Sequence, residues 1–209
     1  QNRGNKKAHD KMMRSSKAYV FFCLALIVFS FLIRLIGWDD PYFGFHIDRK
    51  LNTLQTIEFY AHKGVDFLKP YVYWVPGWQE YHLQELPIYQ ALSAWGSAFT
   101  KTVLSASRSV NLIFAFLTLL IVFQIGVTQF CRKTATYAAL FFAFAPLNLM
   151  YQSATLPDIS VVFFMSVAYW VLAKYLQDTH NKILFLVFLL AGGYCVVVKP
   201  IHFLPIGIL

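Results

Sequence analysis

Three carboxylates in this chain have positions that suit chemistry better than simple solvation. Asp48 ends the segment Gly-Phe-His-Ile-Asp at 44–48, Glu85 begins Glu-Leu-Pro-Ile-Tyr at 85–89, and Asp158 follows Pro157 at the start of an apolar run. A carboxylate can remove the proton from a hydroxyl that attacks an electrophile, and it can orient a substrate by accepting hydrogen bonds. The structural alternative for each is an acid in the first turn of a helix, where it caps or stabilises the helix start.

Two cations, Arg108 and Lys199, lie beside apolar runs. Either side chain could anchor a helix by reaching to the membrane–water interface. The pair also suits a lipid-linked phosphate, because arginine offers a bidentate fork and lysine a compact point charge. The sequence leaves both interpretations open.

Two histidines are candidate metal ligands. His46 stands two residues before Asp48, and His82 has the i, i+3 spacing of one helical face to Glu85. Histidine and carboxylate together can bind a divalent cation. Pro87 follows closely and weakens the helical argument, and a lone histidine is more often structural, so both metal ligands are predictions of the second rank. No P-loop, GxSxG, GxGxxG or HExxH segment is present, which argues against the familiar NTPase, hydrolase, dehydrogenase and zinc-protease classes.

The composition indicates that these residues are positioned by a membrane protein. Hydrophobic residues make up 58% of the chain and charged residues only 13%, which is more apolar surface than a soluble domain can bury. Basic residues concentrate before the first apolar run and predict a cytoplasmic N-terminus by the positive-inside bias. They are Arg3, Lys6, Lys7, Lys11, Arg14 and Lys17. Nucleic-acid binding is the rival interpretation of such a tail, but no aromatic-basic module follows it, so we expect no nucleic-acid partner.

The chain is expected to be an all-α polytopic membrane protein. We divide it into a cytoplasmic tail (1–17), a first span (18–38), a long outer loop (39–103) and a bundle (104–209). Further spans are predicted near 104–130, 136–151, 159–175 and 183–198, with another beginning at 201. Because the chain starts without Met and stops inside an apolar run, we expect it to be a piece of a longer protein.

The outer loop is predicted to carry two short surface helices. Apolar residues recur at steps of three and four from Ile47 to Ala61, with Gly64 as a stop, and again from Ile88 to Phe99 after Pro87. Helices this short and two-faced should lie on the membrane rather than cross it. The intervening residues 66–81 have no clean period and are predicted to be loop. In this topology the acids at 48, 85 and 158 and the cations at 108 and 199 gather at the outer face, where ionisable groups suggest a functional site.

The order of these segments resembles the membrane glycosyltransferases of the GT-C fold. The closest group is the dolichyl-phosphate-mannose–protein mannosyltransferase-like family, which includes the bacterial aminoarabinose transferases. The resemblance rests on Arg34-Leu35, the segments 44–48 and 85–89, Arg108, Asp158 and Lys199-Pro200. It departs from the family at Arg49, where the family usually has Glu.

The resemblance implies an inverting glycosyltransferase of the bacterial inner (plasma) membrane. The donor would be a sugar on a polyprenyl phosphate, and the acceptor a protein, lipid or glycan at the outer face. Asp48 would be the general base, while Glu85 and Asp158 would organise the acceptor or a divalent metal. Arg108 and Lys199 would hold the departing phosphate, and Arg49 is expected to contact it as well.

Two other functional classes compete with this hypothesis. A secondary transporter or flippase would use the carboxylates to bind ions, although transporters tend to keep such groups at the bilayer midplane. A non-enzymatic membrane scaffold would use the aromatic stretch 71–78 to bind a partner, but sugars also stack on aromatic rings. The sequence does not specify the sugar, the acceptor, metal dependence or the oligomeric state.

Overall fold

The computed structural model describes residues 25–36, 46–75, 78–81, 85–177 and 181–199. Helices dominate this part of the chain, with one small hairpin between them. The elements are helical turns over 25–33, α2 (Ile47–Lys63), β1 (Tyr71–Val75), β2 (Trp78–Tyr81), α3 (Ile88–Gly96), the 3-10 turn η1 (Ser97–Phe99), α4 (Val103–Gln129), α5 (Arg132–Phe144), α6 (Pro146–Ser153), α7 (Asp158–Tyr175) and α8 (Lys182–Val198).

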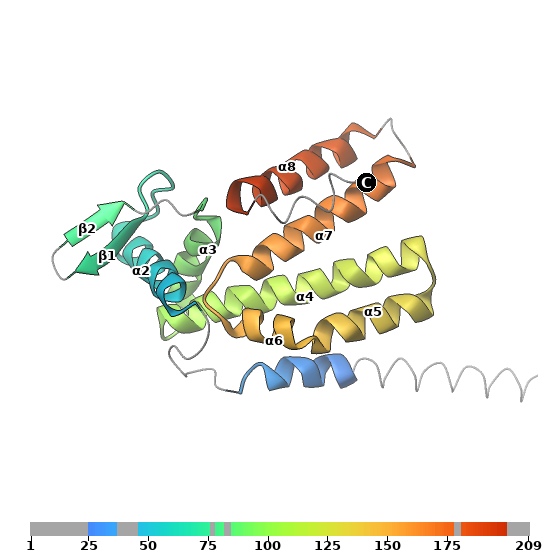
Figure 1. Cartoon of the computed structure of the whole chain (residues 1–209), viewed down its shortest axis with the longest axis horizontal. Helices are drawn as coiled ribbons and strands as arrows, with labels where there is room; N and C mark the ends of the chain where they lie inside the picture. Colours follow the sequence, from blue (N-terminus) through green and yellow to red (C-terminus); the bar gives the residue numbers. More distant parts are fainter. Residues whose placement is uncertain (1–24, 37–45, 76–77, 82–84, 178–180, 200–209) are drawn as a thin grey trace, which may run out of the picture.

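Four helices form a bundle, with the turns over 25–33 and α6 along its side and the other elements at one of its ends. Figure 1 shows α4, α5, α7 and α8 side by side, with α2, α3 and the hairpin beyond the start of α4. α4 and α7 are long and apolar enough to cross a membrane, and α8 is a shorter apolar helix of 17 residues. The prediction of a mainly helical chain is therefore confirmed. The number of membrane spans, and which ends of the helices face the cytoplasm or the outside, stay predictions.

The hairpin corrects the prediction that residues 66–81 are loop. β1 and β2 pair antiparallel with Tyr71 opposite Tyr81 and Val72 opposite Glu80, and the register shifts between Tyr73 and Val75. β-branched and aromatic residues favour a pleated, half-buried surface. The signal was therefore the residue types of 71–75, although the bulge-like irregularity obscures the alternation that usually marks a strand.

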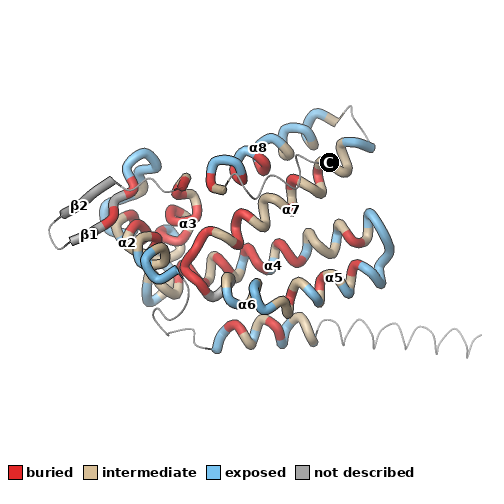
Figure 2. The backbone as a smooth tube through the Cα atoms, in the orientation of Figure 1, coloured by how far each residue is buried: buried red, intermediate tan, exposed pale blue. Residues whose placement is uncertain are grey.

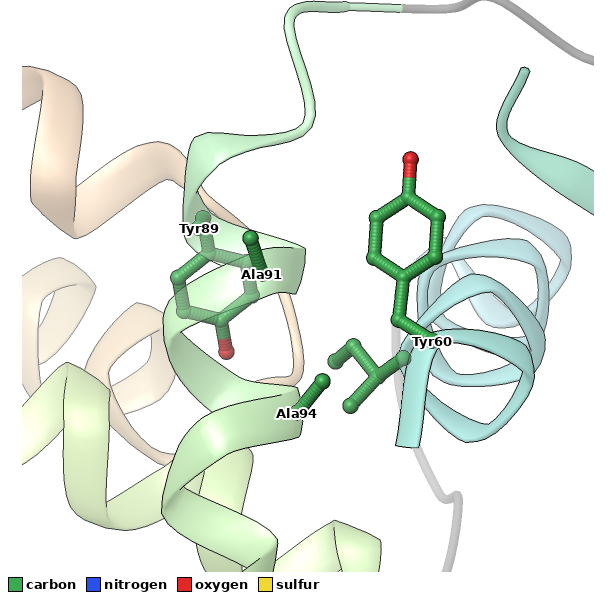
Figure 3. Packing of buried hydrophobic residues seen from close by; sticks show 5 residues of the cluster. Tyr60, Tyr89, Ala91 and Ala94 are labelled. Atoms are coloured by element: carbon green, nitrogen blue, oxygen red, sulfur yellow. The ribbon is translucent and has the colours of Figure 1, made fainter. Parts of the chain in front are cut away.

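Both predicted surface helices exist, but each turns a different face to the protein. α2 ends at Gly64, whose positive φ of 91° suits glycine and whose N–H donates to the Tyr60 carbonyl. Its buried side chains include Ile57 and Tyr60, which contact Ala91 and Ala94 of α3 (Figure 3). The apolar stripes predicted from periodicity remain largely outside this contact: Ile47, Leu51, Trp95 and Phe99 are all exposed.

The predicted third span is two helices rather than one. α5 ends at Phe144 and α6 begins at Pro146. Proline has no N–H to continue the ladder and its ring clashes with the preceding turn. Arg34 occupies this break: it is 4% exposed and donates to the Ala143 carbonyl at 2.7 Å. Arg34 therefore binds the helix break instead of extending to solvent.

Small residues allow α4 and α5 to approach closely. Ala135, Ala139 and Ala143 recur every fourth residue on α5 and are all buried. A Cβ added to Gly126 of α4 would lie 2.5 Å from the Cα of Ala135. Close contact through small residues is the usual way in which helices associate in membranes. Figure 2 shows a second tightly packed region, the continuous buried segment that leads into α7.

Candidate active site

Four charged side chains from four separate segments meet where α2 and the segment before α3 join the bundle. We call Arg49, Glu85, Asp158 and Lys199 the charged cluster. Arg49 Nη2 donates to Glu85 Oε2 at 2.8 Å, and its Nη1 lies 3.6 Å from Asp158 Oδ2. Lys199 Nζ donates to Asp158 Oδ1. The structure thus brings together four of the residues predicted from sequence, in two acid–base pairs linked by Arg49.

The helix topology places Asp158 beside Lys199. α7 and α8 follow one another and pack together, so the first residue of α7 meets the residue that ends α8. The hydroxyls of Ser160 and Tyr194 share a hydrogen bond of 2.7 Å one turn further along this interface. Pro157 has the N-cap position, so Asp158 is a first-turn acid of α7, as the structural alternative allowed, and its carboxylate also pairs with Lys199.

Glu85 is positioned by the residues that follow it. Leu86 and Ile88 pack on a buried cluster of α7 and α8 that includes Val161 and Val198. Two residues after Pro87, Tyr89 is fully buried and donates its hydroxyl to the Ser107 carbonyl of α4 at 3.1 Å. The segment around Glu85 is therefore held on both sides.

Burial controls the charge state of Glu85. Its side chain is only 4% exposed. Desolvation raises the pKa of this carboxyl above its usual range, because the charged form loses its hydration. Arg49 acts in the opposite direction through charge and hydrogen bonding, Lys199 also lowers the pKa, and Asp158 raises it. The net shift is upward, so Glu85 binds a proton more readily than an ordinary glutamate.

Arg108 is buried rather than splayed toward solvent. It is 8% exposed in the second turn of α4. Its charge acts on Lys50 of α2. Desolvation and, after it, the charge of Arg108 lower the pKa of the Lys50 ammonium. Sequence reasoning missed Lys50, whose only signal was its position beside Arg49.

Asp48 directly precedes Arg49 of the charged cluster but takes no part in its ion pairs. It is an exposed acid in the first turn of α2. Successive helical residues point about 100° apart, so Asp48 and Arg49 face different directions. Among the ion pairs of the described residues, none includes Asp48. Glu85 and Asp158 thus share Arg49 as a partner, while the role of Asp48 beside them stays a prediction.

The metal prediction gains no support from this arrangement. His46 is exposed and adopts a positive φ of 63° before α2, and His82 lies outside the described residues. Within the residues that the structure describes, no three His, Cys, Asp or Glu side chains could hold a metal ion together.

Two pockets of different character flank the charged cluster. The first is polar, and its volume of about 10 Å³ is what one water or hydroxyl group needs. It is lined by Asn52, Thr53, Thr56, Pro70, Val72, Glu85, Pro87 and Gln90. The second is mainly apolar, has a volume of about 180 Å³, and is lined by Leu147, Asn148, Tyr151, Asp158, Ile159 and Val162 of α6 and α7. The cluster therefore has one carboxylate in each pocket.

The structure thus combines apolar helices, two of them long enough to cross a membrane, with a charged, partly buried cluster at their end. Residues 86–209, more than half of the chain, match the family described as Dolichyl-phosphate-mannose-protein mannosyltransferase. The chain belongs to this family, whose members are membrane glycosyltransferases that use polyprenyl-phosphate sugar donors. The matched region includes Arg108, Asp158 and Lys199, whereas Asp48 and Arg49 precede it. No curated protein and no solved structure matches the chain.

Proposed function

We propose that this protein is an inverting glycosyltransferase that moves a sugar from a polyprenyl phosphate to an acceptor at the outer face of the membrane. The observation that carries the proposal is the charged cluster, in which acids and cations from α2, the segment before α3, α7 and α8 meet beside an apolar pocket. The bacterial inner membrane is the proposed location, with the N-terminus in the cytoplasm.

The reaction is a single displacement at the anomeric carbon. The acceptor oxygen forms the new bond to the sugar, and the bond from the sugar to the phosphate oxygen breaks with its electron pair on the phosphate. Asp48 takes the acceptor proton, because its exposed position in the first turn of α2 leaves it open to a hydroxyl from outside. One displacement inverts the configuration of that carbon.

The cations of the cluster stabilise the departing polyprenyl phosphate. Arg49 pairs with Glu85, and Lys199 pairs with Asp158. A phosphate can replace these carboxylates as a partner, since Arg49 Nη1 already makes only a long contact of 3.6 Å. Glu85 can then take up a proton, because Arg49 is the strongest of the influences that lower its pKa. Arg108 and Lys50 add positive charge nearby.

The two pockets suggest how the substrates divide. The apolar pocket beside Asp158 would hold the first isoprenoid units of the donor, which leaves the phosphate at the cluster. A protein, lipid or glycan acceptor would approach from the side of Asp48. A divalent cation at His46 and His82 stays a prediction, and loss of transfer in a chelator with recovery on adding Mg²⁺ or Mn²⁺ would support it.

The test is sugar transfer by the purified full-length protein in lipid nanodiscs. Polyprenyl phosphates that carry a labelled hexose, pentose or amino sugar are offered with membrane extracts, and label is followed into protein, lipid and glycan. Asp48→Asn should lower transfer by at least 100-fold while the protein still folds. Glu58→Gln, which neutralises another exposed acid on α2, should leave transfer within twofold of the unsubstituted protein.

Two results would contradict the proposal. Turnover of Asp48→Asn equal to that of the unsubstituted protein would remove Asp48 as the base. Solute uptake in proteoliposomes with no sugar transfer from any donor would favour the transporter or flippase alternative.

A further inference from the structure

Asn111 of α4 connects the bundle to the segment that carries Asp158. Its side chain is fully buried. The amide nitrogen donates to the carbonyls of Ala154 and Leu156, the latter at 3.2 Å. One amide group therefore bridges two backbone carbonyls that are two residues apart, and we call residues 154–156 the stapled segment.

The stapled segment needs such a partner. α6 ends at Ser153 and α7 begins at Asp158, so Ala154, Thr155 and Leu156 lie in the connection between the two helices. Ala154, Thr155 and Leu156 are nevertheless buried. Buried backbone carbonyls require hydrogen-bond donors, because an unsatisfied one has lost its hydration without compensation. Asn111 supplies both donors from a rigid helix.

The same face of α4 also supports Glu85. Ser107 precedes Asn111 by one turn, and its carbonyl accepts the hydrogen bond from Tyr89. Tyr89 follows Glu85 by four residues. The two acid-bearing segments are therefore tied to neighbouring positions on one helix, which fixes the relative placement of Glu85 and Asp158.

We propose that Asn111 is a positioning residue: it holds the start of α7 so that Asp158 meets Lys199 and Arg49 in the geometry used for catalysis. Its relevance to the reaction rests on the proposed glycosyltransferase function. The Asn111 Oδ1 atom is buried with no hydrogen-bond partner in the described part of the chain, so the amide acts here through its two donated hydrogen bonds. Its loss should therefore affect both the stability of the segment and the placement of Asp158.

A cross-linking experiment tests the placement without any substrate. Asp158→Cys and Lys199→Cys are introduced into full-length protein whose native cysteines are replaced, and the rate of bridging by a short bifunctional thiol reagent is measured. Asn111→Ala should slow the bridging at least fivefold, and Asn111→Ser, which keeps one donor, should have an intermediate effect. Thr118→Val is the matched control, because Thr118 is buried seven residues further along α4 and donates only to the Phe114 carbonyl of its own helix.

The same substitutions are then compared for sugar transfer in protein with Asp158 and Lys199 intact. Asn111→Ala should lower kcat at least tenfold, since misplacement of about 1 Å can reduce a rate 100-fold, while Thr118→Val stays within twofold. If Asn111→Ala does not fold, Asn111→Ser carries the comparison. Unchanged bridging in folded Asn111 variants would overturn the inference. Slowed bridging in a protein that transfers no sugar would uphold the placement and overturn the proposed function.

Discussion

The closest approach in the bundle leads to a quantitative prediction for two glycines. In Gly126→Ala the new Cβ would lie 2.5 Å from the Cα and 2.7 Å from the Cβ of Ala135. Ordinary contact begins at 3.4 Å, so α4 and α5 must separate locally by about 0.9 Å. Both neighbouring atoms belong to a fully buried residue close to the backbone, and neither can rotate away. In Gly193→Ala on α8, by contrast, the new Cβ meets nothing within 4 Å.

The two substitutions should therefore have opposite effects on stability. Overpacking costs about 1–3 kcal/mol, and for Gly126→Ala this exceeds the gain of about 1 kcal/mol from replacing glycine in a helix. The expected net loss is up to about 2 kcal/mol. Gly193→Ala retains only the helix-propensity gain and should stabilise the protein by about 0.5–1 kcal/mol.

Thermal unfolding of the purified full-length protein in one detergent would measure the difference. The two variants should differ in Tm by roughly 5 °C, with Gly126→Ala below the unsubstituted protein and Gly193→Ala at or above it. The kcat of folded Gly126→Ala should stay within about threefold, because Gly126 lies in the last turns of α4, away from Arg108. Equal Tm values for the two variants would show that the α4–α5 contact is looser than described.

Three further predictions concern charge and topology. Because burial raises the pKa of Glu85 in the folded protein, the unfolded chain releases this proton first, and stability should fall as pH rises above about 4.5. Glu85→Gln should flatten this pH dependence of stability, and Arg49→Met should steepen it. Identical melting curves against pH in all three proteins would contradict the assignment. Cys131 is exposed in the turn between α4 and α5 and should react with an impermeant maleimide only after cells are opened. A Cys introduced at Lys101, in a protein without Cys131, should react in intact cells. The reverse pattern would place the charged cluster in the cytoplasm. Arg34→Met should lower stability by about 1–3 kcal/mol, since it removes the donor to a buried carbonyl at the helix break, and an unchanged Tm would refute that role.

Local chemistry made several parts of the fold predictable. Gly64 ends α2 because glycine tolerates positive φ, and Pro87 precedes α3 because proline suits a helix start. The residue types of the Glu85 segment, together with Asp158 and Lys199, were sufficient to indicate a site and its family. The Pro146 break and the hairpin were missed although their signals were present, because hydrophobicity was weighed more heavily than proline position and β-branched content.

By itself, the sequence determined a membrane protein of this glycosyltransferase family, the main helices, and the ionisable residues of the site. Only the tertiary structure decided their partners: Arg49 bridges Glu85 and Asp158, Arg34 satisfies a carbonyl 109 residues away, and Asn111 holds the approach to α7. Helix periods, caps and turns depend on neighbouring residues. Ion pairs and staples between distant segments depend on which helix faces pack together, and the apolar stripes of α2 and α3 did not reveal those faces.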